Sequence, residues 1–375
     1  MLRWAARRLV DPTNWWTWHS FEQLLNYILF YINIIGITVA RVDYHWTSKN
    51  NLYHSLRFMS RSTWKDLEAS YHSLGASNLS VGEESLTDYN LLGLSRAMPP
   101  GVISIKKFTR NQEGREVAGV APTGADWEWW FYESGYYYGL RIQAKKTFHQ
   151  SYNTTVQPVY KMGPNATPLK QITDLIRSAQ RNRCTPLYCF YNYWEQNLWR
   201  LFRGSNKLKK EKGQLGCTIA FANEILPMLS AATYKKGYLS VAAPAHPAHP
   251  SVASVSYPLA DIFNLPKSRI DTLMLLTKHS FKGHMTLPHA LFHHVSDLMG
   301  PENKNNPGEI LSNDSIPNAV RSRINFCLEP ESFDYDLGND EDSSLTGIVV
   351  FNGDVLRQLN NRFEYFDEDN IRYRD

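Results

Sequence analysis

Apolar and polar residues alternate along Leu140–Lys145, which reads Leu-Arg-Ile-Gln-Ala-Lys. Strict alternation is typical of a β-strand with one buried face. It places Gln143 and Lys145 together on the polar face of the strand. Upstream, the aromatic-rich run that follows Asp126 favours a second strand, because aromatic residues pack well on a pleated sheet.

These two strands predict a hairpin. Gly135 and Gly139 lie between the two runs, where glycine suits a tight turn. Antiparallel pairing then brings Asp126, at the head of the first strand, close to the polar face of the second strand. Glu128 shares the face of Asp126 if the first run is extended, since side chains two apart in a strand point the same way.

Other patterns extend the hairpin into a longer series of elements. Helical spacing of apolar residues predicts helices over residues 82–95 and 168–181. Runs of apolar and aromatic residues predict strands over residues 102–108, 186–193 and 345–351. This order predicts an α/β (α+β) fold in which a mixed sheet is flanked by helices.

The polar groups of the hairpin suit the hydrolysis of phosphodiesters. That reaction requires neutralisation of the phosphate charge and activation of a water, and a divalent cation with open coordination positions supplies both. Asp126 is the first candidate ligand. The Gln143 side-chain oxygen or the Ile142 carbonyl is a candidate second ligand. Lys145 is placed to position the water and to stabilise negative charge that develops in the reaction.

The Gly-Ala-Asp sequence that ends at Asp126 and the Gln-Ala-Lys-Lys run that starts at Gln143 resemble the PD-(D/E)xK nuclease superfamily. The closer resemblance is to Mrr-like restriction endonucleases, in which Gln replaces the acid of the last motif. It covers roughly residues 56–200. It implies a restriction-endonuclease-like core, Mg²⁺ or Mn²⁺ as cofactor, cleavage of double-stranded DNA, and a role in restriction or antiviral defence. In the superfamily, the positions of Asp126, Gln143 and Lys145 carry the catalytic and metal-binding roles.

The superfamily also has an acid on a helix ahead of the hairpin. Glu84 is our preferred counterpart, because at helical spacing it falls on one stripe with Thr87, Leu91 and Leu94 and so lies at the edge of an inward-packing face. Glu83 is the alternative. Glu128 is a further candidate metal ligand. Two plainer interpretations stay open: the glutamates favour the start of a helix through its dipole, and the hairpin residues belong to a solvated surface.

Composition indicates an ordered protein, since aromatic residues make up 13% of the chain and charged residues 20%. The net charge of +4 permits nucleic-acid binding without requiring it. A local basic stretch predicts phosphate contacts, with a solvated loop as the alternative. The candidate contact residues are Arg200, Arg203, Lys207, Lys209 and Lys210.

The four cysteines fit neither a zinc signature nor a dense disulfide framework, which favours a reducing compartment such as the cytoplasm. The nearly continuous apolar run over residues 24–40 is at the short end for a membrane span. We consider three interpretations for it: a membrane anchor, a buried helix, or sequence outside the functional core.

The sequence therefore predicts three parts: an N-terminal apolar and aromatic segment over residues 1–55, a nuclease-like core over residues 56–235, and a C-terminal extension over residues 236–375. The leading hypothesis is a metal-dependent endonuclease that acts on DNA, and the residues do not discriminate DNA from RNA as its substrate. The alternative is a catalytically inactive interaction protein with a nuclease fold, either soluble or tethered to a membrane through its N-terminal segment. A homodimer would suit double-strand cleavage, which needs two active sites.

Overall fold

The structure is a computed structural model of the 375-residue chain. It describes residues 48–73, 81–107, 125–152, 155–162, 168–195, 198–203, 212–230, 238–242, 251–263, 286–299, 308–329, 345, 347–356 and 358. The chain divides after Trp46, and all described residues belong to the unit Thr47–Asp375. The apolar segment over residues 24–40 lies outside the described residues. Within the described part of the chain, no helix combines the length and the apolar character needed to cross a bilayer.

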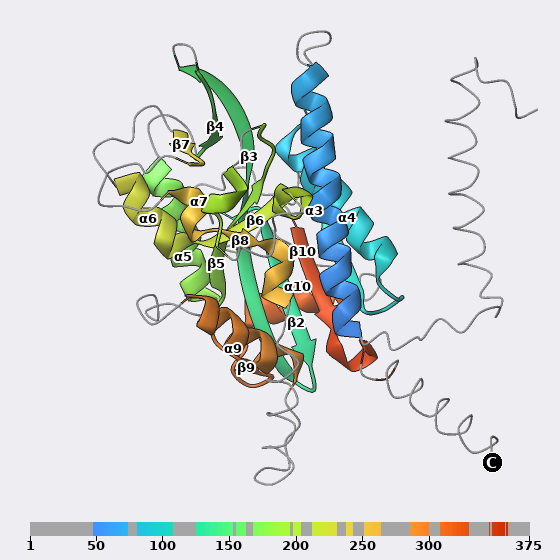
Figure 1. Ribbon diagram of the computed structural model, residues 1–375. Coiled ribbons are helices and arrows are strands. Elements are labelled where there is room, and N and C mark those ends of the chain that lie inside the picture. The colour runs from blue at the N-terminus through green and yellow to red at the C-terminus, as the bar shows by residue number, and fades with distance from the viewer. Residues whose placement is uncertain are drawn as a thin grey trace, which may run out of the picture. The chain divides into compact units, whose positions relative to one another are not determined.

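A mixed sheet forms the centre of this unit (Figure 1). Its main path runs through β1 (Ile103–Lys107), β10 (Gly347–Asn352), β2 (Trp127–Glu133), β3 (Tyr136–Tyr152), β5 (Thr185–Tyr191), β6 (Cys217–Phe221) and β8 (Tyr257–Pro258). Three further strands lie off this path: β4 (Thr155–Lys161) and β9 (Leu311–Ser312) pair with β3, and β7 (Tyr238–Ser240) pairs with β4.

The helices interleave with these strands along the chain. They are α3 (Ser48–Ser73), α4 (Glu83–Ala97), α5 (Pro168–Arg181), α6 (Ala222–Ser230), α7 (Val252–Val255), α9 (Leu287–Met299) and α10 (Asn318–Leu328), with short 3-10 helices η1 (Leu198–Leu201), η3 (Lys212–Gly216) and η4 (Leu259–Phe263). The mixed α/β fold class is confirmed. The helices and strands expected around the hairpin are present, and α5 has the bounds that its apolar spacing indicates.

Strand directions follow from the connections. The hairpin strands β2 and β3 are antiparallel, whereas β3 and β5 are parallel and are joined through α5. Parallel neighbours need such a crossover because the chain must return to the same end of the sheet. The late strand β10 inserts between β1 and β2, antiparallel to β1 and parallel to β2. Residues that we assigned to a C-terminal extension therefore contribute a strand to the same sheet as the hairpin.

The hairpin turn differs from expectation in one detail. The turn is made by Ser134 and Gly135, both with positive φ (52° and 79°), as a type I′ turn requires. Gly139 is not part of the turn but lies inside β3, opposite Trp130. A Cβ at Gly139 would lie 2.6 Å from the Trp130 ring. Glycine is needed there so that the indole can pack against the strand.

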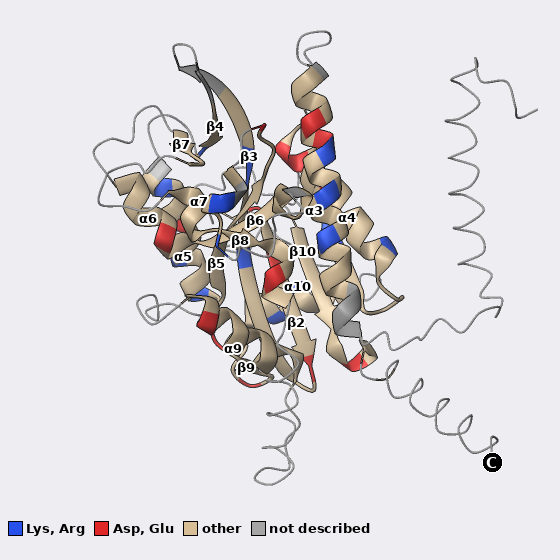
Figure 2. Ribbon diagram, in the orientation of Figure 1, with Lys and Arg blue, Asp and Glu red and all other residues tan. Residues whose placement is uncertain are grey.

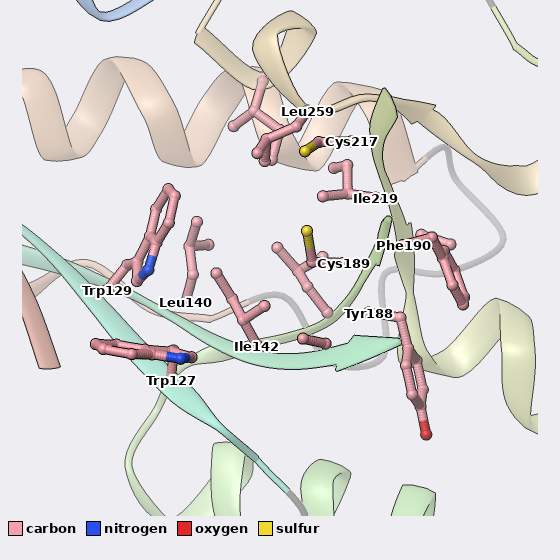
Figure 3. Close-up of a cluster of buried hydrophobic side chains, with 14 of the residues drawn as sticks. Trp127, Trp129, Leu140, Ile142, Tyr188, Cys189, Phe190, Cys217, Ile219 and Leu259 are labelled. Atoms are coloured by element: carbon pink, nitrogen blue, oxygen red, sulfur yellow. The ribbon is translucent and has the colours of Figure 1, made fainter. Parts of the chain in front are cut away.

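The two faces of the sheet are covered by different helices. One face buries Trp127, Trp129 and Ile142 against α3, α4 and η4, and Figure 3 shows these side chains grouped with Leu259 and Cys189. The opposite face meets α5 and α10. All four cysteines are buried and free, as is common for this small, weakly polar side chain.

Candidate active site at the open edge of β3

The candidate site is built where β2 begins and β3 continues alone. The β2–β3 pairing covers β3 up to Ile142, and β4 pairs with β3 only from Thr147 onward. Between these points, this edge of β3 has no neighbouring strand among the described residues, and two carboxylates bind its backbone instead. Asp126 Oδ2 accepts a hydrogen bond from the Ala144 N–H at 2.8 Å, and Glu83 Oε2 accepts one from the Lys146 N–H at 2.9 Å.

This arrangement fixes the spacing of the two acids. Amides two residues apart on one edge of a strand are separated by about 7 Å, so the bound carboxylates stand side by side with similar spacing. Each acid uses one oxygen to bind the edge. Asp126 Oδ1 accepts no hydrogen bond from a described residue, whereas Glu83 Oε1 lies 3.8 Å from the Lys145 ammonium. The edge of β3 thus holds two carboxylates around one lysine.

A small cleft of about 70 Å³ opens between the first turn of α4 and the start of β2. Carboxylates dominate its polar lining. The lining residues are Glu83, Glu84, Thr87, Asp88, Asp126, Trp127 and Ala144. Figure 2 shows acidic and basic residues interspersed over α3 and α4, the helices on this side of the sheet.

Burial and mutual repulsion make both carboxylates reluctant to ionise. Burial raises the pKa of Glu83 to about 7, opposed by the Lys145 ammonium and reinforced by Asp126. Burial also raises the pKa of Asp126, against the stabilising effect of Lys145 and of the Ala144 N–H, and with a further raising effect of Glu84. One lysine is therefore insufficient to neutralise this acidic edge, and a bound cation would relieve the excess negative charge.

Gln143 links the acid to the far side of the sheet. Its Nε2 donates to Asp126 Oδ2 at 2.5 Å, and its Oε1 accepts a hydrogen bond from Gln171 Nε2 at 3.0 Å. Gln171 lies in the first turns of α5, and the sequence analysis did not identify it. A glutamine among the polar residues of an amphipathic helix gives no signal of this contact, which depends on how α5 crosses the sheet.

Glu83, and not our preferred Glu84, contacts Lys145. Glu83 binds the strand edge and approaches Lys145. Glu84 is exposed, lines the same cleft and acts on Asp126 through its charge. The difference arises because consecutive residues point about 100° apart around a helix axis. The Ile142 carbonyl, our other candidate for the second metal ligand, accepts a hydrogen bond from the Asp126 N–H at 2.9 Å.

The residues present fit a hard divalent cation such as Mg²⁺. Mg²⁺ keeps several of its waters and is commonly bound through one or two carboxylates. Asp126 Oδ1 and the α4 carboxylates face one cleft in this way. No group of three or more His, Cys, Asp or Glu arranged to hold a metal occurs among the described residues, so any coordination shell here would depend on amide, carbonyl or water oxygens as well.

Glu128 does not belong to this site. It is fully buried and accepts hydrogen bonds from Arg141 at 2.6 Å and from Arg323 of α10 at 3.1 and 3.2 Å. The Trp130 indole N–H also donates to it. With its oxygens engaged by two arginines and an indole, Glu128 is a structural ion-pair residue and not a metal ligand.

The basic stretch is only partly described. Arg203 contacts Glu224 at 3.0 Å, and its guanidinium donates to the Ser254 carbonyl and the Tyr257 hydroxyl, so it stabilises local packing. Arg200 is exposed on η1. Lys207, Lys209 and Lys210 lie outside the described residues.

Comparison with known families covers all of this site. The model of a "Family of unknown function (DUF6615)" matches residues 52–355, more than half of the chain. The chain belongs to this family. The DUF6615 match includes α4, the β2–β3 hairpin and α5, and therefore every residue that forms the cleft. No curated protein and no solved structure matches the chain.

Proposed function

We propose that this DUF6615 protein is a metal-dependent nuclease that hydrolyses phosphodiester bonds at the open edge of β3. The observation that carries the proposal is that Asp126 and Glu83 line one small cleft, that the Lys145 ammonium lies 3.8 Å from Glu83, and that Gln143 is bonded to Asp126. The resemblance of the hairpin to Mrr-like nucleases supports the same chemistry. The order α4, β2, β3, α5, β5 is in keeping with the core that this resemblance implies.

A divalent cation, Mg²⁺ or Mn²⁺, would be held by Asp126 and by Glu83 or Glu84, and would supply charge neutralisation and an activated water. The protein residues do the rest. Lys145, whose ammonium lies 3.8 Å from Glu83, orients the attacking water and stabilises negative charge on the phosphate. Glu83, with a pKa of about 7, exchanges a proton readily near neutral pH. The Ala144 and Lys146 amides hold both carboxylates in place.

We propose double-stranded DNA as the substrate, because the resembled nucleases act on it, and a role in antiviral defence for the same reason. A homodimer would provide the two sites needed for double-strand cleavage. The four free, buried cysteines support a reducing compartment such as the cytoplasm.

The test uses the purified full chain with linear and supercoiled DNA, with Mg²⁺, with Mn²⁺ and with a chelator. We expect cation-dependent cutting that Asp126→Asn abolishes and that Lys145→Met lowers by about 10²–10³-fold. Matched controls are Asp66→Asn, an exposed acid of α3, and Lys170→Met, an exposed lysine of α5, and both should cut as the unmodified chain does.

Two results would contradict the proposal. Cutting that survives both site variants would place the activity elsewhere. A chain that neither cuts nucleic acid nor binds the cation would favour the alternative of a non-catalytic interaction protein.

A further inference from the structure

The Gln171–Gln143–Asp126 chain contains an acceptor that the present arrangement leaves unused. Gln171 donates its Nε2 to Gln143, but Gln171 Oε1 is buried and has no hydrogen-bond partner among the described residues. A buried amide oxygen without a donor costs about 1–3 kcal/mol. Such a group beside the candidate site points to a second arrangement in which this oxygen accepts a hydrogen bond.

The present arrangement is also unsuited to a cation. Gln143 directs its NH₂ group to Asp126 and its oxygen away from the cleft, toward α5. An NH₂ group has no lone pair to offer a hard cation, which is bound by oxygen ligands. In this state Asp126 receives a hydrogen bond from a neutral amide, which does not neutralise its charge.

We infer that Gln143 and Gln171 form a paired amide switch, an inference that rests on the proposed cation site. When a cation binds Asp126, both side-chain amides turn over. Gln143 then directs Oε1 to the cation, and its NH₂ group donates to Gln171 Oε1. The hydrogen bond between the two amides is kept with its direction reversed, and Gln171 Oε1 gains a donor. In exchange, the Gln143 NH₂ group gives up its bonds to Asp126 Oδ2 and to the Ala144 carbonyl, and the Gln171 NH₂ group takes the position that Oε1 now has.

The geometry permits this exchange without movement of the strands. An amide flip interchanges an oxygen and a nitrogen of nearly equal size, so the flanking packing is retained. The Gln143 terminal atom and Asp126 Oδ2 lie 2.5 Å apart. Neighbouring oxygens in an octahedral Mg²⁺ shell lie about 2.9 Å apart, because each Mg–O bond is about 2.1 Å. The flipped Gln143 oxygen and Asp126 would thus be adjacent ligands after a small adjustment.

Gln171 is accordingly a positioning residue that acts through Gln143. It can serve both states because an amide donates from one end and accepts at the other. The switch also explains how a glutamine can take the place of an acid in the hairpin motif. A carboxylate needs no reorientation, whereas a glutamine needs a partner that accepts its NH₂ group when its oxygen faces the cation.

The experiment follows the side-chain NH₂ signals of nitrogen-15 glutamine-labelled full chain by NMR during a Mg²⁺ titration, with binding measured in parallel by calorimetry. Gln143→Met and Gln171→Met assign the two signals. Gln180, exposed near the end of α5, gives a reference signal that should not move. We expect the Gln143 and Gln171 signals to shift together, at the Mg²⁺ concentrations at which calorimetry detects binding.

Gln143→Glu is the decisive variant. The introduced carboxylate binds the cation directly and accepts from Gln171 Nε2 in both states, so Mg²⁺ should still bind while the Gln171 signal stays in place. If Mg²⁺ binds through Asp126 but the Gln171 signal does not move in the unmodified chain, or moves equally in Gln143→Glu, the switch is refuted and the nuclease proposal survives. If neither the unmodified chain nor Gln143→Glu shows Mg²⁺ binding that Asp126→Asn removes, the cation site itself is refuted, and the switch with it.

Discussion

Asp126 and Glu128 lie two residues apart at the start of the same strand, yet their surroundings are opposite. Glu128 is fully buried and bonded to two arginines. Asp126 lies at the open edge of β3, bonded to a neutral amide and a backbone N–H, with one lysine nearby. Glu128 thus has two arginines bonded to it, whereas Asp126 has one lysine nearby and, within the described part of the chain, no cationic side chain bonded to it.

This contrast separates an acid that stabilises the fold from an acid that is available for chemistry. Arg141 and Arg323 both bind Glu128, at the junction of β2, β3 and α10. Removal of one partner from a buried ion pair leaves an uncompensated charge. Asp126 differs, because its raised pKa means that the neighbouring groups do not fully offset the burial of its charge. A bound cation would neutralise the charge that the neighbouring residues of Asp126 leave uncompensated.

The largest effect is expected for Glu128→Gln. This variant leaves Arg141 and Arg323 buried without their carboxylate, and we expect a loss of about 3–5 kcal/mol in the free energy of unfolding. Chemical denaturation of the full chain measures it. As a control, Glu309→Gln breaks an exposed pair with Arg183 and should cost about 1 kcal/mol or less. Equal losses in the two variants would show that the Glu128 cluster does not stabilise the fold.

The next effect concerns activity at the open edge. Lys145→Met removes the ammonium beside Glu83 and should lower kcat for DNA cutting by about 10²–10³-fold, the usual loss when one group that stabilises the transition-state charge is removed. Steady-state cleavage assays measure it. The variant should fold normally, because its methylene chain keeps the packing. A decrease below tenfold would assign Lys145 a minor role.

Unlike Glu128→Gln, Asp126→Asn should affect cation binding and leave the stability of the fold nearly unchanged. A neutral amide removes the cost of burying a charge, which is the main reason for the raised pKa of Asp126, and also the repulsion from Glu84. The free energy of unfolding should therefore change by less than about 1 kcal/mol in the absence of metal. The same variant should lose cation binding, measured by calorimetry with Mn²⁺. A large loss of stability with cation binding retained would reverse the roles that we assign to the two acids.

The hairpin could be predicted from the sequence because its signals are local. The period-two pattern of β3 and the apolar spacing of α5 depend on neighbouring residues alone. Helix α5 has the predicted bounds, and β3 contains the predicted strand but extends beyond it at both ends, from Tyr136 to Tyr152. The turn was assigned less accurately: Gly139 is required by the packing of Trp130, which no local pattern reveals. The convergence of Asp126, Gln143 and Lys145 followed from the strand register, which the hairpin fixes.

The features that were missed depend on contacts between distant parts of the chain. Glu128 is distinguished from Asp126 by Arg323, 195 positions away, and by α10, whose place under the sheet has no signature in the hairpin. The insertion of β10 between β1 and β2 is likewise a long-range pairing. The choice between Glu83 and Glu84 depends on the rotation of α4 about its axis, which only the packing of the helix against the sheet determines.

The smallest expected effect is a pH dependence that Glu83 imposes on the open edge. Below its pKa of about 7 this carboxyl carries a proton in the folded chain, and a cation must displace that proton. Mn²⁺ affinity should therefore rise as pH increases from 6 to 8, by up to about tenfold for each pH unit below the pKa when one proton is displaced.

The stability of the metal-free chain should change in the opposite direction. The folded pKa of Glu83 lies above its ordinary value of 4.5, so the folded state binds more protons than the unfolded state between pH 4.5 and about 7. The free energy of unfolding should then decrease as pH rises through this window. Glu83→Gln should flatten both profiles. If the Mn²⁺ affinity of this variant still rises with pH as in the unmodified chain, a group other than Glu83 binds the proton that the cation displaces. The role that we assign to Glu83 at the open edge would then be wrong.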